Sequence, residues 1–400
     1  MRAQILVRET FMLRRHTCIL LACLLAAGTV AAQATPAQAD TIKVGITFSA
    51  TGPAASLGIA QRNSVALFPK QIAGQDVEYI VLDDGGDTSR AVANMRKLID
   101  ENNVDLIMGS TVTPASLAML GVAAEKQVPM IATAASGALI APMDAQRHWV
   151  FKTPQNDGLM ADAIVQNMTK AGIKTVAFIG FSDAYGDGWL NEFTRATKAA
   201  GIEITTVEKY ARPDTSVTGQ VLKIMATAPQ AVLVAGSGTP AALPQKTLRE
   251  RGYKGPIYQT HGITNNEFLK VGGKDVEGTI LPTGPILVAD QLPDSNPVKA
   301  VALSYIHAYD AMYGAGTASP FGANAYDAML LFKAAVPAAL SHAKPGTAEF
   351  RSALRDGIEG LHGVVLDHGI ATMSPTDHNG FDTSARVMVT IQNSTWKLLP

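Results

Sequence analysis

Between residues 104 and 136 the chain alternates two short apolar runs with one amphipathic stretch. The runs at 104–110 and 128–136 flank a helical pattern over residues 113–127. Apolar runs this short, separated by a helix, are typical of neighbouring buried parallel strands in an α/β sheet. Small hydroxyl residues follow each run, namely Ser110, Thr111 and Thr113 after the first and Thr133 and Ser136 after the second.

These hydroxyl residues are predicted to lie at one edge of the sheet. In parallel sheets the carboxyl ends of the strands share an edge, and ligands bind there. Thr113 and Pro114 also form a helix-start pattern, with Thr as N-cap and Pro at the first helical position. Hydroxyls together with the free N–H groups of a helix start suit a carboxylate or another small polar group.

The alternation of strand and helix continues on both sides of this stretch. Before it, strands are predicted at residues 42–48 and 76–82 and helices at 57–72 and 90–102. After it, strands are predicted at 175–180, 202–209, 231–235 and 256–260, with helices at 164–170, 189–200, 217–226 and 241–251. Two such series predict an α/β protein with two Rossmann-like lobes and mostly parallel sheets, rather than one long sheet.

The last third of the chain departs from this rhythm. An extended, Pro-containing segment at residues 278–285 precedes three helical patterns at 297–313, 321–340 and 347–356. Two extended segments follow, at 386–392 and 396–399. We therefore expect residues 278–285 to carry the chain back toward the first lobe.

The first 39 residues have the pattern of a secretory signal peptide. Arg14 and Arg15 precede an apolar stretch at 17–32, and small residues end at Ala39, where cleavage is predicted. A membrane anchor, export by the twin-arginine route and lipid attachment at Cys23 are the alternatives. The apolar stretch is short for a membrane span. We expect a periplasmic protein.

Composition narrows the function further. The chain has 400 residues, 47% hydrophobic and 17% charged, with a net charge of −1. That balance gives no electrostatic argument for nucleic-acid binding. Both cysteines lie in the predicted signal, so no disulfide is expected afterwards.

No sequence motif calls for a cofactor or a metal ion. Residues 236–241 fit the dinucleotide pattern G-x-G-x-x-A, but Pro240 interrupts the turn and no acidic residue follows at the distance a ribose needs. Asp83, Asp84 and Asp87 lack the spacing of a calcium loop, and capping of the following helix is the favoured interpretation.

Two side chains at predicted strand ends have open interpretations. Tyr185 lies in a loop predicted at residues 182–188, where it either contacts a ligand or packs on the next helix. Ser56 follows the first strand and either contacts a ligand or caps the helix predicted from residue 57.

Several short segments, in order, carry a family resemblance. They are Gly45-Ile46, Thr51-Gly52-Pro53, Asp83-Asp84, Ile107-Met108-Gly109, Ala132-Thr133-Ala134, Phe151-Lys152-Thr153, residues 183–188 and Val276-Glu277-Gly278. In this order and spacing they resemble the periplasmic leucine/isoleucine/valine-binding proteins that serve ABC importers. The resemblance covers essentially all of residues 40–400.

This resemblance implies two lobes joined by a three-crossover hinge that closes on a ligand. It places residues 40–153 and 284–373 in one lobe and residues 154–283 and 374–400 in the other. It also implies a monomer that docks on an inner-membrane permease. The ligand-binding positions that it implies are Ser110, Thr111, Thr113, Thr133, Ala134, Ser136, Tyr185, Gly238, Thr239 and Phe321.

One position departs from the family pattern. Members that bind amino acids place an acidic residue, which pairs with the α-ammonium group, where this chain has Gln259-Thr260-His261-Gly262. His261 cannot replace that carboxylate, because a neutral imidazole is a weak acceptor and an imidazolium repels a cation. Either Asp157 or Asp183 takes over this role, or the ligand lacks an α-amino group. We favour the second, with an aromatic, keto or hydroxy acid bound near His261, Tyr185 and Phe321.

Three classes of function compete at this point. The favoured one is a solute receptor that captures a carboxylate. An enzyme would need a nucleophile with its base, or a cofactor loop, and the sequence shows neither. A ligand sensor of the same fold, or a receptor for branched-chain or other amino acids, is the remaining alternative.

Overall fold

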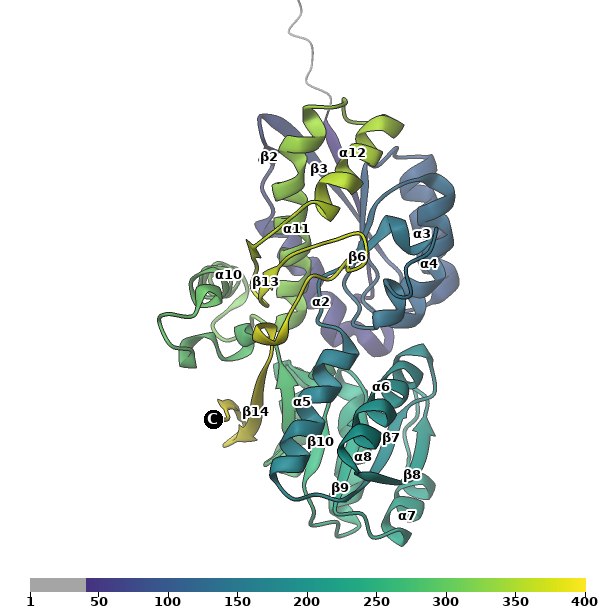
Figure 1. Ribbon diagram of the computed structural model, residues 1–400, viewed down its shortest axis with the longest axis vertical. Helices are drawn as coiled ribbons and strands as arrows, with labels where there is room; N and C mark the ends of the chain where they lie inside the picture. The colour runs from purple at the N-terminus through teal and green to yellow at the C-terminus, as the bar shows by residue number, and fades with distance from the viewer. Residues whose placement is uncertain (1–40) are drawn as a thin grey trace, which may run out of the picture. The chain divides into compact units, whose positions relative to one another are not determined.

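The computed structural model describes residues 41–400, so the predicted signal peptide and its cleavage site after Ala39 lie outside the described residues. Within these residues the chain forms two main sheets (Figure 1). The six-stranded sheet has the order β2-β3-β1-β4-β5-β6, and only β2 is antiparallel to its neighbour. The seven-stranded sheet has the order β15-β14-β11-β10-β9-β7-β8, with β14 and β15 antiparallel to their neighbours. These sheets confirm the predicted α/β class.

The six-stranded sheet and its helices make up what we call the first lobe. Its strands are β1 (Ile42–Phe48), β2 (Gln71–Ile72), β3 (Gln75–Asp83), β4 (Leu106–Gly109), β5 (Met130–Ala132) and β6 (Val150–Lys152). Its helices are α2 (Ala55–Ser64), α3 (Thr88–Asp100), α4 (Thr113–Lys126), α10 (Pro297–Tyr313), α11 (Pro320–Leu340) and α12 (Ala348–Glu359). A small ribbon of β12 (Val364–Val365) and β13 (Ile370–Ala371) follows α12.

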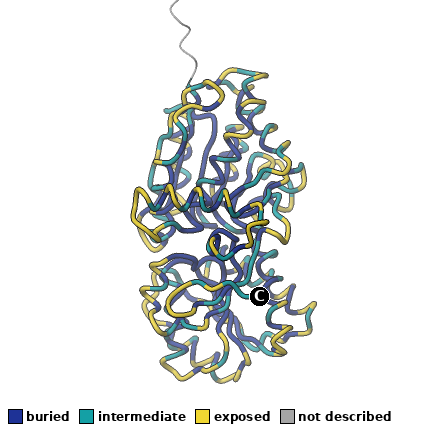
Figure 2. The backbone as a smooth tube through the Cα atoms, turned by 90° about the vertical axis from the view of Figure 1, so that its left-hand side faces the viewer, coloured by how far each residue is buried: buried dark blue, intermediate teal, exposed yellow. Residues whose placement is uncertain are grey.

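Side chains of β4 show why the strands of this lobe are continuously apolar. Leu106 and Met108 pack with α11 and α12 on one face of the sheet, whereas Ile107 packs with α3 and α4 on the other. Alternate residues of a strand point to opposite faces, so a strand covered on both sides needs apolar residues throughout. The buried strands therefore lie between two layers of helices (Figure 2).

The seven-stranded sheet and its helices make up the second lobe. Its strands are β7 (Thr175–Phe181), β8 (Glu203–Tyr210), β9 (Ala231–Ala235), β10 (Ile257–Gln259), β11 (Ile280–Thr283), β14 (Val387–Gln392) and β15 (Thr395–Leu398). Its helices are α5 (Asp157–Lys170), α6 (Ala184–Ala200), α7 (Thr218–Ala226), α8 (Ala242–Glu250) and α9 (Asn266–Gly272). Trp189 and Phe193 of α6 are fully buried in the main core of this lobe.

The chain passes between the two sheets three times. The passages lie between β6 and α5, between β11 and α10, and between β13 and β14. Helices α11 and α12, which come late in the chain, therefore cover one face of the six-stranded sheet, which contains β1 (Figure 1).

Several predicted elements differ from the structure, and three of the differences concern segments next to the strand ends. The helix predicted at residues 57–72 ends at Ser64, and Phe68 is extended because Pro69 disfavours a helical conformation before it. The loop predicted at residues 182–188 already contains the first turn of α6, which Asp183 caps. The N-cap of α4 is Val112, so Thr113 is its first helical residue rather than its cap.

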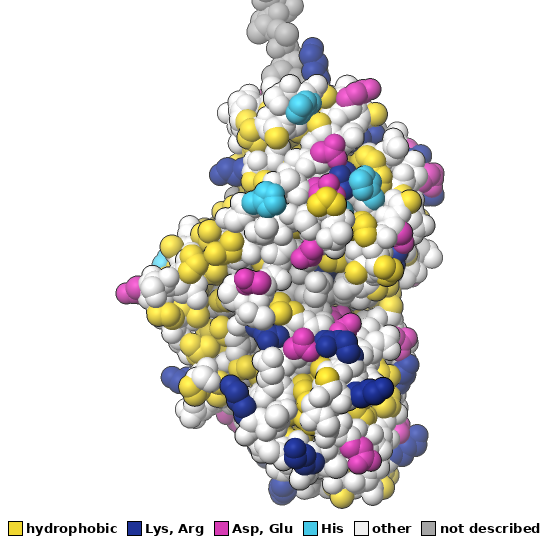
Figure 3. Space-filling view, viewed as in Figure 1, with side chains coloured by type: hydrophobic (Ala, Val, Ile, Leu, Met, Phe, Trp, Pro, Cys, Tyr) yellow, Lys and Arg dark blue, Asp and Glu magenta, His cyan; other side chains and the backbone are white. Residues whose placement is uncertain are grey.

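The surface carries charges of both signs without a field of one sign on the face in Figure 3. Across residues 41–400, no helix combines the length and the apolar character that a membrane crossing requires.

Candidate functional site

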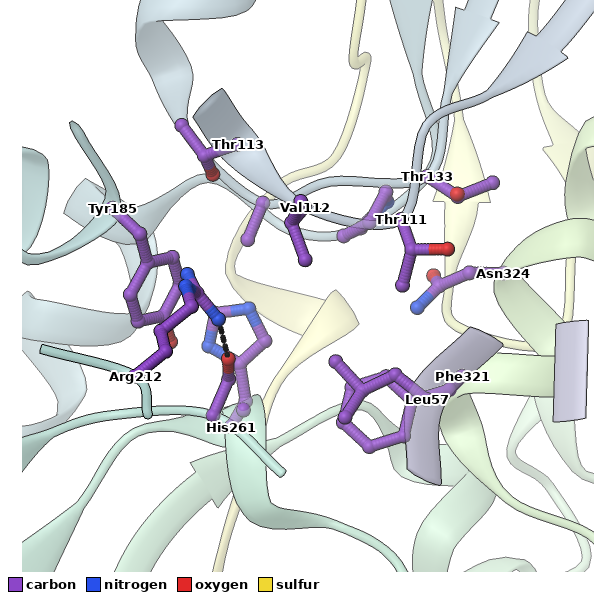
Figure 4. Close-up of a pocket in the computed structure, with 14 residues that line it drawn as sticks. Leu57, Thr111, Val112, Thr113, Thr133, Tyr185, Arg212, His261, Phe321 and Asn324 are labelled. Atoms are coloured by element: carbon purple, nitrogen blue, oxygen red, sulfur yellow. Dashed lines mark hydrogen bonds between the residues drawn. The ribbon is translucent and has the colours of Figure 1, made fainter. Parts of the chain in front are cut away.

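A cavity between the two lobes lies where the carboxyl ends of β4, β5 and β9 meet the following loops. It contains about 410 Å³ of space between atoms when the solvent at its open mouth is included. First-lobe residues and the first passage contribute Leu57, Thr111, Val112, Thr113, Thr133, Ala135, Pro154, Phe321 and Asn324. The second lobe contributes Tyr185, Arg212, Ser237, His261 and Gly262 (Figure 4).

The first-lobe wall is built on the start of α4. No side chain caps this helix, and Pro114 in its first turn has no N–H group. Thr113 is 1% exposed, and its buried hydroxyl has no hydrogen-bond partner among the residues that the structure describes. A helix start with free N–H groups and a buried, unpartnered hydroxyl is suited to a ligand carboxylate.

Thr111 and Thr133 line the same wall, but their hydroxyl groups already donate elsewhere. Thr111 donates to Gln61 and accepts from the N–H of Ser49. Thr133 donates to the carbonyl of Ser110 at 3.1 Å. Both side chains therefore shape the wall, and Thr133 Oγ1 retains only acceptor capacity toward a ligand.

A buried carboxylate behind this wall explains the orientation of Ser110. Asp84 is fully buried and accepts hydrogen bonds from Thr47 at 3.0 Å, Ser49 at 2.6 Å and Ser110 at 2.8 Å. The Ser110 hydroxyl, which was predicted to contact a ligand, therefore donates to Asp84 in this structure. The carboxylate is a stronger acceptor than a neutral group and holds the strand ends together.

Asp183 organises the second-lobe wall. It caps α6 by accepting from the N–H groups of Tyr185 and Gly186, and it pairs with Arg212 Nε at 2.6 Å. Arg212 Nη1 donates to Ser237 Oγ at 3.0 Å, the bond dashed in Figure 4. The guanidinium lies 4.2 Å from the centre of the Phe181 ring. Arg212 is therefore held firmly at the cavity.

His261 and Tyr185 complete this wall. Burial, together with the charge of Lys152, lowers the pKa of His261 to about 3, so its imidazole is neutral near pH 7. Tyr185 shares a hydrogen bond of 2.8 Å with Thr260, and burial raises the pKa of its phenol. Neither group carries a charge at neutral pH.

A buried cation and a buried carboxylate lie at the first passage between the lobes. Lys152 donates to the carbonyl of Pro154 at 2.6 Å and to Asn156 at 2.9 Å, and burial lowers its pKa. Burial raises the pKa of Asp157, whose carboxylate oxygens have no partner within residues 41–400. Asp157 does not line the cavity.

The structure brings together half of the predicted site. Thr111, Thr113, Thr133, Tyr185, His261 and Phe321 line the cavity, whereas Ser56, Ser110, Ala134, Ser136, Gly238 and Thr239 do not. Ala134 is buried in the core of the first lobe, and Thr239 begins a short 3-10 helix.

Three of the residues that miss the cavity lie where the two lobes touch. A Cβ atom on Gly238 would come within 2.8 Å of Ser56 Oγ and 2.7 Å of Leu57 Cδ1. A Cβ atom on Gly188 would lie 3.3 Å from Ser136 Oγ, which accepts from the N–H of Ala138. These positions set how closely the lobes approach.

Sequence reasoning missed eight lining residues, which are Leu57, Val112, Ala135, Pro154, Arg212, Ser237, Gly262 and Asn324. Arg212 follows β8 closely, so its place at a carboxyl strand end was the available signal. Asn324 lies three residues after Phe321 on α11, and residues at this spacing share a helix face.

The site contains no cluster suited to a metal ion among residues 41–400. Of the three aspartates considered for a cation, Asp87 caps α3 by accepting from the N–H of Arg90, as predicted. Asp83 accepts from the N–H of Ala50 and the hydroxyl of Thr51, which fixes the loop after β1.

Comparison with known families identifies the family to which this chain belongs. The family model described as "Periplasmic binding protein" matches residues 41–395. The chain belongs to this family. It is a periplasmic solute-binding protein, and the expectation that it is not an enzyme is confirmed by the binding proteins that it resembles.

Three relatives show how far the likeness extends. A Leu/Ile/Val-binding protein homologue of Brucella melitensis is 25% identical over 81% of this chain and 85% of its own length. The structure of an extracellular ligand-binding receptor from Rhodopseudomonas palustris HaA2 is 48% identical, with a TM-score of 0.88 over 90% of this chain and 100% of the other. An R. palustris ABC-transporter solute-binding protein in complex with benzoate is 20% identical, with a TM-score of 0.73 over 90% and 95% of the chains. The predicted resemblance to the leucine/isoleucine/valine-binding family is confirmed.

Proposed function

We propose that this periplasmic binding protein captures a small carboxylate that lacks an α-amino group and delivers it to the permease of an ABC importer. The observation that carries the proposal is the charge of the cavity lining. Among the described residues that line it there is one cation, Arg212, and neither Asp nor Glu. An α-ammonium group would lie there without a carboxylate partner, at a cost of several kcal/mol, on the order of 3 or more.

The walls suggest how such a ligand is bound. We place its carboxylate at the start of α4, beside the hydroxyl of Thr113. We place its apolar body against Leu57 and Phe321, which lie side by side in Figure 4. The solute-binding protein solved with benzoate shows that a protein of this fold holds an aromatic acid. Closure of the lobes about the three passages then excludes water from the carboxylate.

The test is calorimetry with ligands that differ at one position. Leucine and its keto acid, 4-methyl-2-oxopentanoate, share a carbon skeleton and differ only at the α-carbon, which carries an ammonium group in leucine and a keto oxygen in the acid. Benzoate and phenylalanine extend the comparison to aromatic bodies. We expect the keto acid or benzoate to bind at least about 100-fold more tightly than either amino acid, since a buried unpaired ammonium costs several kcal/mol. Tight leucine binding with no response to the acids contradicts the proposal.

A second candidate function is a receptor for amino acids, favoured by Asp157. Both of its carboxylate oxygens are buried without a partner among residues 41–400, close to the cavity residue Pro154 in the chain. Asp183, the other acid considered, is committed to Arg212 and to the cap of α6. If leucine binds and Asp157→Asn abolishes that binding, Asp157 is the ammonium partner and the amino-acid function is correct.

A further inference from the structure

The second-lobe wall offers more hydrogen-bonding groups than a benzoate-like acid can use. Arg212 is fixed by Asp183 through Nε and by Ser237 through Nη1. Its Nη2 group forms no hydrogen bond within residues 41–400, and the side chain lines the cavity. A guanidinium held in this way presents its free N–H donors to a ligand without further loss of side-chain entropy.

His261 lies on the same wall and is unpartnered. The residue is 9% exposed, and neither ring nitrogen has a hydrogen-bond partner among the residues described. A neutral imidazole has one donor and one acceptor, and leaving both unpaired in a buried site is unfavourable. In Figure 4 Arg212, Tyr185 and His261 gather on one side of the cavity.

The charge of this wall decides which ligand group fits it. The charge of Arg212 is compensated by Asp183 at 2.6 Å, and His261 and Tyr185 are neutral. A second carboxylate would meet no uncompensated cation there and would lose its hydration. A neutral oxygen can accept from Arg212 and pair with His261 without that loss.

We propose that the ligand carries a second, neutral oxygen function, a hydroxyl or a keto group, away from its carboxylate, and that Arg212 and His261 recognise it. A hydroxyl fits best, because it accepts from Arg212 Nη2 and donates to the acceptor nitrogen of His261. This inference rests on the proposed function and specifies the substrate class of the same site.

The test compares acids with and without the second oxygen by calorimetry. Benzoate is paired with 3-hydroxybenzoate, 4-hydroxybenzoate and benzene-1,4-dicarboxylate, and pentanoate is paired with 4-oxopentanoate. We expect at least one oxygenated acid to bind tenfold or more tightly than its parent, and the dicarboxylate to gain nothing.

Two variants test whether Arg212 and His261 cause this gain in affinity. Arg212→Met and His261→Phe are each expected to reduce the ratio of affinities between the oxygenated acid and its parent to less than threefold. The readout is a ratio, so a general loss of affinity does not affect it. Arg212→Met removes the partner of Asp183 and could prevent folding. In that case His261→Phe alone still tests the proposal. Arg195→Gln, in the exposed part of α6, is the matched control and should leave the ratio unchanged.

The outcomes separate this inference from the proposed function. Parent acids that bind as tightly as every oxygenated acid, or a gain that survives both variants, overturn the inference alone. A gain found only with the dicarboxylate also overturns it, because the wall then recognises an anion. Tight leucine binding with no binding of any of these acids overturns both proposals.

Discussion

The two walls of the cavity use different means to present polar groups. The first-lobe wall has no charged side chain, and its polarity comes from the start of α4 and from Thr113. The second-lobe wall is built around an ion pair, with Asp183 holding both Arg212 and the first turn of α6. Under the proposed function, the first wall binds the carboxylate and the second wall selects the rest of the ligand.

The ion pair of the second wall is where we expect the largest effect. The side chains of Asp183 and Arg212 are 23% and 16% exposed, so Asp183→Ala leaves a mostly buried cation unpaired and removes a helix cap. We expect a loss of about 2–4 kcal/mol in the free energy of unfolding, measured with urea. Asp162→Ala, which breaks an exposed pair with Arg195, is the control and should cost less than about 1 kcal/mol. Equal losses would mean that the pair does not organise this wall.

The contact between the walls is tested by Gly238→Ala. Gly238 has a φ of +61°, and an added Cβ would lie 2.7 Å from Leu57 Cδ1 across the lobes. We expect ligand affinity to fall, because the ends of the Leu57 and Ser56 side chains must shift before the lobes can approach as closely as they do here. Gly201→Ala has the same backbone strain, with a φ of +65°, but meets nothing within 4 Å. This control should lose about 1–2 kcal/mol of stability and no affinity. If both variants keep full affinity, this contact does not limit closure.

On the first wall, Thr113→Val separates binding from stability. The Thr113 hydroxyl has no partner in the described part of the chain, so its removal should leave stability unchanged and weaken ligand binding by about 1–2 kcal/mol. Thr111→Val should lower stability and leave ligand affinity unchanged, because that hydroxyl bridges Ser49 and Gln61. Calorimetry and thermal unfolding distinguish the two. Unchanged affinity in Thr113→Val would remove this hydroxyl from the site.

The neutral His261 predicts a pH dependence of stability. Its pKa is about 3 in the folded protein and near 6.5 in the unfolded chain. The unfolded state therefore binds one more proton between these values, and stability falls by up to about 1.4 kcal/mol per pH unit as the pH drops below 6.5. His261→Gln should reduce this slope in urea titrations at pH 4–6. An identical slope in both proteins would show that His261 is not buried in its neutral form.

The smallest effect is expected for Ser136→Ala. Ser136 accepts from its own turn at 3.3 Å and does not line the cavity. Affinity measured by calorimetry should change by less than about 0.5 kcal/mol, as for substitutions away from a site. A loss of tenfold or more would place this hydroxyl on the ligand.

Sequence reasoning predicted elements best where the pattern was local. Residues 42–48 and 231–235 form strands with the predicted bounds, because a continuous apolar run between turn residues has few alternatives. The predicted helix at 57–72 was too long, since a weak helical pattern runs on toward Pro69, where the real chain has already become extended.

The cavity lies at the predicted edge of the first sheet, but its lining differs in detail from the predicted residues. The edge follows from parallel strand ends, which placed Thr113 and Thr133 together, whereas His261 follows β10 of the other sheet and was predicted from the family resemblance. The direction of each hydroxyl depends on partners far along the chain. Ser110 lies 26 positions from Asp84, to which it donates, and Arg212 lies 29 positions from Asp183. Such pairings arise from tertiary packing, so no local pattern indicated them.

The three passages between the sheets determine when the first lobe can finish folding during synthesis. One face of the first sheet is covered by α11 and α12, which come from residues synthesised long after β1. A nascent chain that ends before Pro320 therefore exposes Val44, Ile46 and Met108 to water. The N-terminal half cannot become a finished lobe ahead of the rest, and the polypeptide remains incompletely folded until nearly all of it has been made.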